Sequence, residues 1–471
     1  MTTDKFRSQL RQEAELWRAE GIINDSQHQQ LSQRYQFNNL DTSSRNQFVT
    51  VLIGIGSILI GLGVITFVAA NWQDLPKTAK VLLLLSLLII VNATGFYFWR
   101  KLSSSPQRLG NGLLILGALI LGANIGLMGQ LFHSTNPFYE LLLAWGIGVL
   151  VMAYSLHLTS LAAMAIILIW SGYLGFISND LFSSASQNPT WSSFLGQHMP
   201  LLACIVFIPL AYLCKSRWIF CLSAIAILSS AVINLSLLGD RLFNLSTLQT
   251  SGWLVAIAFA LPSALLWSYD DSYLTYTTKS FSRSARNLAL LYLAIVIYSS
   301  SFYGLWQYWN NSSLSLETLR SINWFPLVDI FLLVIVAILQ WLRLGRTIAR
   351  HRPLHSQDLT TIVIGLLITI TALIPIWHTN VASIPELATF AFNAMLFILS
   401  VGLMREGLSH GQRRAFWFGL LLLIFRIMHW FLLSVSGLFF KSLVFVLCGV
   451  GVIAIGLWFE KYVRTFGNPA N

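Results

Sequence analysis

Five polar side chains lie within or beside two apolar stretches between residues 111 and 156. They comprise two amides, an imidazole, a phenol and a carboxylate: Asn124, Gln130, His133, Tyr139 and Glu140. Polar groups at membrane depth are costly and usually face a cavity or a partner. A histidine beside a carboxylate can shuttle protons or bind a cationic or hydroxylated ligand. One interpretation is an outward-facing polar pocket. The other is that Glu140 only accepts bonds from unpaired N–H groups at its helix start.

A segment earlier in the chain has similar chemistry. Asn71, Trp72 and Asp74 lie in VAANWQDLPKTAK (68–80), at the outer ends of the first two predicted helices. Asp74 and Lys77 could form only a solvated pair, worth less than about 1 kcal/mol. Together with the first group, however, they would place polar side chains from four consecutive helices at one face.

Arg426 is a charge inside an apolar stretch, and His429 follows it on the same helical face. An arginine at the centre of a membrane helix costs about 2.5–3.5 kcal/mol on insertion scales. The expected partners are Asp329 and Glu386, which lie near the starts of two other apolar stretches. Such an ion pair could lock helices together or belong to a substrate or proton pathway, and the sequence leaves both open.

A second histidine suggests a weak internal repeat. His133 and His378 each lie near a Thr-Asn pair and precede a helix that begins with Glu-Leu, within residues 131–145 and 376–390. Transporters often carry substrate sites at the interface of such repeats; chance similarity is the alternative. We group the ionisable residues of the later helices as one predicted intramembrane charge network: Asp329, His378, Glu386, Arg426 and His429.

The composition indicates which class of protein must position these groups. The chain of 471 residues is 56% hydrophobic and only 10% charged, whereas globular chains carry about 25% charged residues. Apolar stretches of roughly 17 to 25 residues recur along the chain, and each can span a bilayer. The expected fold is therefore all-α, a polytopic integral membrane helix bundle with the lipid bilayer as its partner.

Hydropathy gives about fourteen transmembrane helices. Their predicted ranges are 49–70, 79–99, 111–132, 138–156, 158–177, 200–214, 218–238, 251–269, 287–309, 324–344, 359–377, 385–404, 415–435 and 439–459. The sixth range is short for a spanning helix.

The distribution of positive charge indicates the orientation. With the N-terminus inside, most of the 29 Lys and Arg residues fall on the inner side. The outer loops hold only Lys77, Lys80, Arg241, Arg320 and Lys441. Because loops rich in Lys and Arg stay cytoplasmic, we expect a bacterial inner-membrane protein with both termini in the cytoplasm. The net charge of +11 then reflects topology rather than nucleic-acid binding.

Residues 1–47 are expected to form a separate unit before the transmembrane domain at 48–471. Apolar residues repeat at helical spacing in its first half, Gly21 is suited to end this helix, and Asn24 or Asp25 is suited to cap a second one. The sequence predicts a cytosolic amphipathic helical hairpin that is too small for an independent core. It would dock on the membrane domain, a second copy or a cytosolic partner, or serve as a simple tether.

Motifs of soluble catalysis and metal binding are absent from the sequence. There is no glycine-rich phosphate loop, HExxH or GxSxG, and the four cysteines form no CxxC pair. We therefore predict neither a metal nor a cofactor. The glycines suit helix packing instead, because Ala118, Gly122 and Gly126 form a stripe of small residues at i, i+4 spacing.

Three segments carry a family resemblance: LWRAEGIINDSQHQQLSQRY (16–35), IGLGVITFVAANWQDLP (60–76) and LLILGALILGANIGLMGQLFH (113–133). They resemble the bacterial membrane-protein family catalogued as domain of unknown function 2157, and FYELLLAWGIG (138–148) resembles its continuation. The likeness is best within 48–177 of the membrane domain. It implies a short cytosolic helical segment followed by membrane helices, and it transfers no functional residue.

Three functions fit these patterns. The first is a transporter or flippase-type carrier with an outward-facing polar pocket. The second is a membrane-embedded transferase that acts on a lipid-linked substrate at the outer leaflet, which would need a general base there. The third is a non-catalytic scaffold or sensor. Convergence of Arg426, Asp329 and Glu386 on a cavity would favour transport, and a lateral opening lined by His133 and Glu140 would favour the enzyme.

Overall fold

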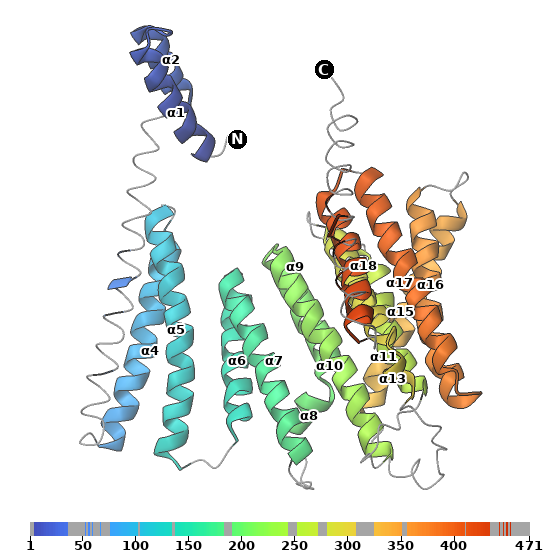
Figure 1. Ribbon diagram of the computed structural model, residues 1–471. Coiled ribbons are helices and arrows are strands. Elements are labelled where there is room, and N and C mark those ends of the chain that lie inside the picture. The colour runs from blue at the N-terminus through green and yellow to red at the C-terminus, as the bar shows by residue number, and fades with distance from the viewer. Residues whose placement is uncertain are drawn as a thin grey trace. The chain divides into compact units, whose positions relative to one another are not determined.

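The structure is a computed structural model that describes ten segments of the chain. They are residues 4–35, 76–101, 104–133, 137–182, 191–243, 252–271, 280–307, 325–350, 356–409 and 411–433, with isolated positions elsewhere. All regular secondary structure in these segments is helical (Figure 1). The chain divides into two compact units, Met1–Leu87 and Leu88–Asn471. The domain boundary predicted at residue 47 lies outside the described segments.

The first unit begins with two short helices, α1 (Asp4–Ala19) and α2 (Asp25–Tyr35). Ala14 is fully buried between them, among Leu10, Trp17, Ile23, Leu31 and Tyr35. Gly21 has φ +74°, a left-handed conformation that ends α1. Asn24 Oδ1 accepts a hydrogen bond from the Gln27 N–H at 2.8 Å, and Gln27 Oε1 accepts one from the Asn24 N–H at 3.0 Å. This reciprocal cap fixes the start of α2.

The remaining helices follow in chain order, and the first of them crosses the boundary between the two units. They are α4 (Lys77–Trp99), α5 (Ser104–Leu131), α6 (Phe138–Leu156), α7 (Thr159–Phe182), α8 (Trp191–Gln197), α9 (Met199–Leu213), α10 (Arg217–Phe243), α11 (Gly252–Trp267), α12 (Ser282–Ser300), α13 (Tyr303–Gln307), α15 (Phe325–Arg350), α16 (Ser356–Asn380), α17 (Pro385–Ser409) and α18 (Arg413–Leu433).

Eight helices in the described segments are long and apolar enough to cross a membrane, or nine spans if α8 and α9 form one bent span. The expected fourteen are therefore not confirmed. Helices α11, α12 and α18 occupy predicted positions but are not among the eight, and α11 has only 16 residues. The predicted spans 49–70 and 439–459 lie almost entirely outside the described segments. Many exposed side chains are nevertheless apolar, such as Ile205 and Phe331, as expected for a membrane protein.

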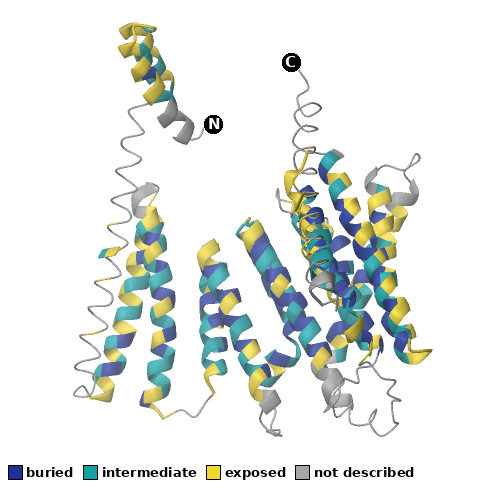
Figure 2. Ribbon diagram, viewed as in Figure 1, coloured by how far each residue is buried: buried dark blue, intermediate teal, exposed yellow. Residues whose placement is uncertain are grey.

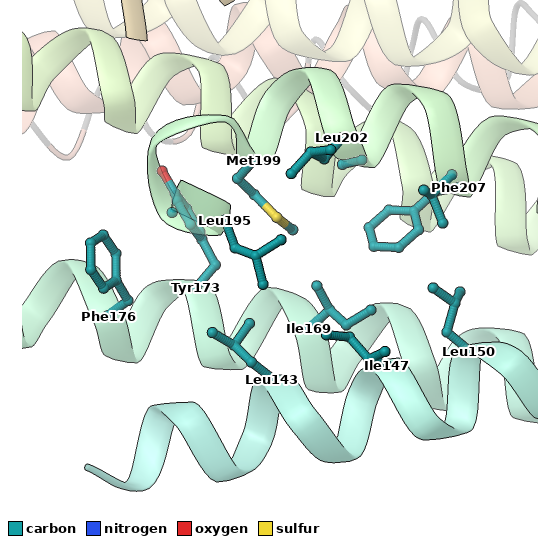
Figure 3. Close-up of a pocket in the computed structure, with 13 residues that line it drawn as sticks. Leu143, Ile147, Leu150, Ile169, Tyr173, Phe176, Leu195, Met199, Leu202 and Phe207 are labelled. Carbon is teal, nitrogen blue, oxygen red and sulfur yellow. The ribbon is translucent and has the colours of Figure 1, made fainter. Parts of the chain in front are cut away.

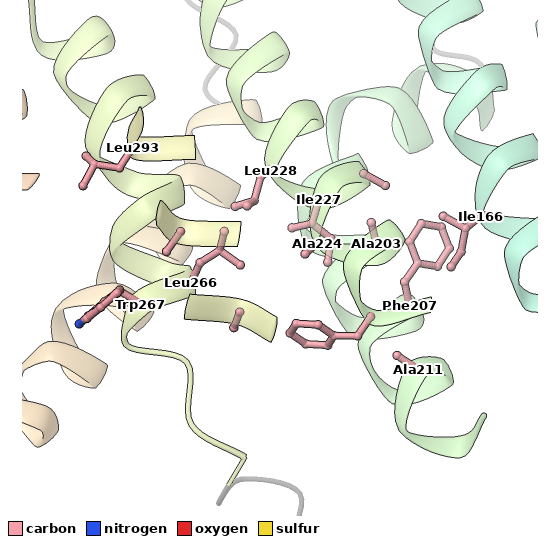
Figure 4. Packing of buried hydrophobic residues seen from close by; sticks show 14 of the residues in the cluster. Ile166, Ala203, Phe207, Ala211, Ala224, Ile227, Leu228, Leu266, Trp267 and Leu293 are labelled. Atoms are coloured by element: carbon pink, nitrogen blue, oxygen red, sulfur yellow. The ribbon is translucent and has the colours of Figure 1, made fainter. Parts of the chain in front are cut away.

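The centre of the second unit is α10, the most buried of the spanning helices (Figure 2). Around it, α7, α9, α11 and α12 contribute to one continuous core. Figure 4 shows part of this core, where Phe207 of α9 lies toward Ile166 of α7 and Ala203 of α9 lies beside Ala224 of α10. Small residues on α9 and α10 let these helices approach closely.

The stripe of small residues on α5 packs against α6, as predicted. Ala118 is fully buried, and its carbonyl accepts a 2.7 Å hydrogen bond from Trp145 Nε1 of α6. The indole lies over Gly122, where an added Cβ would come within 2.3 Å of Trp145 Cε2. Glycine at this position therefore makes room for the tryptophan.

Replacing Gly122 with alanine is expected to destabilise the protein by about 1–3 kcal/mol, because overpacking forces the indole to move. Gly112 on the same helix provides the control, since a Cβ there meets no atom within 4 Å. Gly112→Ala should stabilise by up to about 1 kcal/mol through helix propensity. Thermal unfolding of the two purified variants in detergent measures both changes in stability. Equal melting temperatures for the two variants would contradict this account of the α5–α6 contact.

A carboxylate in the loop after α11 holds the start of α12. Asp271 accepts hydrogen bonds from Ser280 Oγ at 2.6 Å, from the N–H groups of Phe281 and Ser282 at 3.0 and 3.1 Å, and from the Tyr212 hydroxyl. Burial alone would raise the pKa of Asp271, but these hydrogen bonds outweigh burial and lower the pKa below its ordinary value of 3.8.

This lowered pKa makes a pH-dependent contribution to stability. The contribution is fully present above the unfolded-state pKa, near 4, and is lost as pH falls through the lower folded-state value. Asp271→Asn should therefore melt below wild type at pH 6, and the difference should shrink as pH falls below about 4. Asp270→Asn, at the exposed neighbour, should have a smaller effect. A difference that persists unchanged to pH 3 would show that the charge of Asp271 is not involved.

Candidate functional site

The main irregularity in the membrane helices is a sharp break at His198. Helices α8 and α9 meet there at 78°. Pro200 in the first turn of α9 is favoured at a helix start, because its missing N–H is not needed there. A break leaves backbone groups without helical partners, and at membrane depth these must be satisfied by other parts of the protein.

The carbonyl groups released by this break are bound by a side chain of α10. Asn234 Nδ2 donates to the Gln197 carbonyl at 2.9 Å and to the Gly196 carbonyl at 3.4 Å. Asn234 Oδ1 accepts a 2.7 Å hydrogen bond from the Tyr173 hydroxyl of α7. Asn234 is 6% and Tyr173 is 1% exposed. Two buried side chains from two helices therefore fix the break.

A histidine–carboxylate pair occupies the break itself. His198 Nδ1 lies 2.9 Å from Asp329 Oδ1 of α15, and the two side chains are 18% and 3% exposed. An aspartate this deeply buried requires a partner, and the imidazole supplies it. The pair joins the break to a helix more than a hundred residues away in sequence.

A fourth helix holds α8 from its other end. Ser192 Oγ, which is fully buried, donates a 2.9 Å hydrogen bond to Glu140 Oε1 in the first turn of α6. Helices α6, α7, α10 and α15 thus each contribute one polar side chain to the short α8 and the break. We call this set the break cluster: Glu140, Tyr173, Ser192, His198, Asn234 and Asp329.

An apolar cavity of about 160 Å³ lies beside the break cluster, between α6, α7, α8 and α9. Figure 3 shows Leu143 and Ile169 on one side, Met199 and Phe207 on the other, and Leu195 of α8 at the end near the break. Tyr173 lines this end and directs its hydroxyl toward the break (Figure 3). A cavity of this size with an apolar lining can take an apolar group the size of benzene.

The residues predicted to form an outward pocket lie in different environments. Glu140 belongs to the break cluster, and Tyr139 packs edge-on against Phe176 with ring centroids 5.7 Å apart. Gln130 and His133, in contrast, are exposed. His133 has φ 55° and ends α5 in a left-handed conformation.

The other predicted outward residues add little to this site. Asn124 is buried within α5 at 4% exposure. Asn71, Trp72 and Asp74 lie outside the described segments.

The residues of the predicted intramembrane charge network lie at more than one site and do not form the ion pairs expected of them. Arg426 was expected to pair with Asp329 or Glu386, and this is wrong. Arg426 instead donates to Asn393 Oδ1 at 2.6 Å and to the Ser301 carbonyl at 2.9 Å. Asp329 pairs with His198, and Glu386 is exposed in the first turn of α17.

The two remaining histidines of the predicted network make structural contacts. His378 is fully buried beside Trp306, and its Nδ1 accepts the Ile384 N–H at 3.0 Å. His429 packs against Phe302 with its ring tilted by 54° and ring centroids 4.3 Å apart. The two histidines that suggested an internal repeat lie in different environments, because His133 is exposed and His378 is buried.

The sequence analysis did not identify four residues of the break cluster: Tyr173, Ser192, His198 and Asn234. Tyr173 and Asn234 lie within the predicted spans 158–177 and 218–238, and Ser192 and His198 lie between the predicted spans 158–177 and 200–214. The available signal was the QHMP sequence at 197–200, a polar pair followed by a proline before an unusually short apolar stretch. Within the segments that the structure describes, no group of three His, Cys, Asp or Glu side chains could hold a metal ion.

The family resemblance of the sequence is confirmed. Residues 15–162 match the model of a family described as "Predicted membrane protein (DUF2157)". No curated protein and no solved structure matches the chain. The matched residues include α2, α4, α5 and α6 and end before α8. The break at His198 therefore lies beyond the part of the chain that the family match covers.

Proposed function

We propose that this membrane protein, whose N-terminal part matches that family, is a carrier for an amphipathic, lipid-like molecule. The break at His198, held by buried polar side chains beside an apolar cavity, is the observation that carries the proposal. Broken membrane helices mark substrate sites in several transporter folds, because their ends supply polar backbone groups at depth. The cavity would take an apolar part of the substrate, and the break cluster would lie near its polar part.

The orientation proposed from the distribution of charge supports this assignment. With both termini in the cytoplasm of a bacterial inner membrane, the start of α6, helix α8 and the start of α15 all fall toward the outer side. The break cluster would then lie near the outer leaflet, where a flippase-type carrier receives or releases its substrate. Movement of α8 relative to α9 would change access to the cavity.

Movement of fluorescent phospholipids across liposome membranes tests this function. Vesicles with the purified protein would contain NBD-labelled phosphatidylglycerol or phosphatidylethanolamine, and external dithionite would report the labels that reach the outer leaflet. Wild type should move at least one label about tenfold faster than vesicles without protein, a change of about 1.4 kcal/mol in the barrier. Asp329→Asn should lose this acceleration.

Ile205→Ala provides the control, because Ile205 lies on α9 but is 61% exposed. This variant should keep the wild-type rate. If neither label moves faster with wild-type protein than without it, the carrier proposal is wrong. If Asp329→Asn moves lipid at the wild-type rate, the break cluster is not part of the carrier.

A further inference from the structure

A second polar site lies on different helices, where Arg426 of α18 meets the end of α12. Arg426 follows Arg413 by thirteen residues, about 20 Å along α18 at 1.5 Å per residue. Its side chain is half-buried. Within the hydrocarbon region such a charge requires stabilisation by nearby groups.

The groups around this guanidinium are uncharged. Nε donates to Asn393 Oδ1, and Nη2 donates to the carbonyl of Ser301, the C-cap residue of α12. Asn393 is held in turn, because its Nδ2 donates to the Thr389 carbonyl at 2.7 Å and to the Ser301 carbonyl at 3.2 Å. A helix C-terminus offers roughly half a negative charge. In the described part of the chain, no carboxylate forms an ion pair with Arg426.

The guanidinium also keeps hydrogen-bonding capacity. It has five N–H groups; two are used in the described contacts, so three remain for further acceptors. The guanidinium lies over the Phe302 ring, with Cζ 4.9 Å from the ring centroid. Phe302 therefore restricts the guanidinium orientation, and a restricted planar fork suits bidentate binding of an oxyanion.

His429 extends the site one turn further along α18. Its ring packs against the same Phe302 at a tilt of 54°, with ring centroids 4.3 Å apart. Imidazole nitrogens can donate to a second oxygen of the same ligand. A long arginine side chain can extend along its helix so that its charged end reaches toward the head groups.

We propose that Arg426 and His429 bind one phosphate group, with Phe302 as the supporting surface and Asn393 as a positioning residue. The ligand class is a phosphate oxyanion, carried by an anionic lipid or free in solution. Bidentate charge-assisted bonds supply the missing negative charge, which the neutral partners of Arg426 do not. This site shares no residue with the break cluster, so the inference stands independently of the carrier proposal.

Thermal unfolding in a neutral detergent tests the site with three probes: phosphatidylglycerol, diacylglycerol and inorganic phosphate. Phosphatidylglycerol should raise the melting temperature of wild type, whereas diacylglycerol, which lacks phosphate, should not. Native mass spectrometry should show a retained phosphatidylglycerol molecule. Arg426→Gln should weaken this binding by at least about tenfold, as expected for loss of a charged hydrogen bond worth 1.5–3 kcal/mol.

Arg414→Gln is the matched control, because it removes the same charge from an exposed position of the same helix. It should bind phosphatidylglycerol as wild type does. Stabilisation by inorganic phosphate equal to that by the lipid would assign the site to a soluble anion.

The proposal is overturned if wild type shows no preference for phosphatidylglycerol or phosphate over diacylglycerol, a result that needs no variant. It is also overturned if Arg426→Gln binds as well as Arg414→Gln. If Arg426→Gln does not fold, His429→Gln takes its place and should weaken binding severalfold.

Discussion

Replacement of Asp329 alone by leucine is expected to cost about 3–5 kcal/mol of unfolding free energy, the range for breaking a buried ion pair. Neutral hydrogen bonds between membrane helices average only about 0.6 kcal/mol, with a maximum near 1.7. We expect the larger value because Asp329 is 3% exposed and its loss leaves His198, 18% exposed, without its carboxylate. Unfolding by SDS in mixed micelles, followed by circular dichroism, measures the change.

The double variant His198→Leu with Asp329→Leu distinguishes a charged pair from general damage to the fold. Apolar replacement of both members of a buried pair is often neutral, or stabilising by about 1–4 kcal/mol. The double variant should therefore regain most of the stability that the single variant loses, while lipid movement stays absent. A single-variant cost below about 1 kcal/mol would mean that the pair does not hold the break.

Filling the apolar cavity should separate stability from transport. Ala203 lies on the cavity wall and is 2% exposed. Ala203→Leu is expected to raise the unfolding free energy by about 0.5–2 kcal/mol, as cavity-filling substitutions commonly do. The same variant should slow phospholipid movement by about tenfold, because the added side chain occupies the space assigned to the substrate.

Ala123→Leu makes the same chemical change at an exposed position of α5. It should change neither the unfolding free energy nor the rate of phospholipid movement. The dithionite assay and the SDS titration together give both readouts. An Ala203→Leu protein that gains stability and keeps the wild-type rate would remove the cavity from the transport path. If Ala203→Leu lowers both the unfolding free energy and the rate of phospholipid movement, the added side chain overpacks the site. Ala203→Val would then repeat the test with a smaller side chain.

The local packing of this protein could be predicted from its sequence better than its long-range contacts. The stripe from Ala118 to Gly126 was readable because the residues that meet α6 recur every four positions on one helix. For this stripe the helical repeat alone determines which side chains share a face. The start of α2 was predicted at Asn24 or Asp25 from residue type alone, whereas the reciprocal bonds between Asn24 and Gln27 appear only in the structure.

The partners of buried charges could not be predicted in this way. Pairing His198 with Asp329 requires knowing that α9 and α15 are neighbours in the bundle, which no periodicity encodes. The sequence shows which residues are charged, so carboxylates were the predicted partners of Arg426. It does not show which backbone carbonyl is free to accept a hydrogen bond, such as the Ser301 carbonyl at the end of α12. The count of fourteen spans is not confirmed for a different reason. Eight helices of the described segments are long and apolar enough to span, or nine with the bent pair α8 and α9, and two predicted spans lie almost entirely outside those segments.

The bond between His198 and Asp329 also has a consequence for how the protein assembles. Helices α6 and α7 are sequence neighbours joined by a turn at His157, whose φ is 53°, so their contacts close only a short loop. Contacts between distant residues form more slowly than local ones. His198 and Asp329 are 131 residues apart, so the break cannot be completed until α15 has been synthesised and inserted. Until then His198 lacks its carboxylate partner, so the contacts that fix α8 and α9 are incomplete during biosynthesis. Misassembly of these helices would begin in this interval.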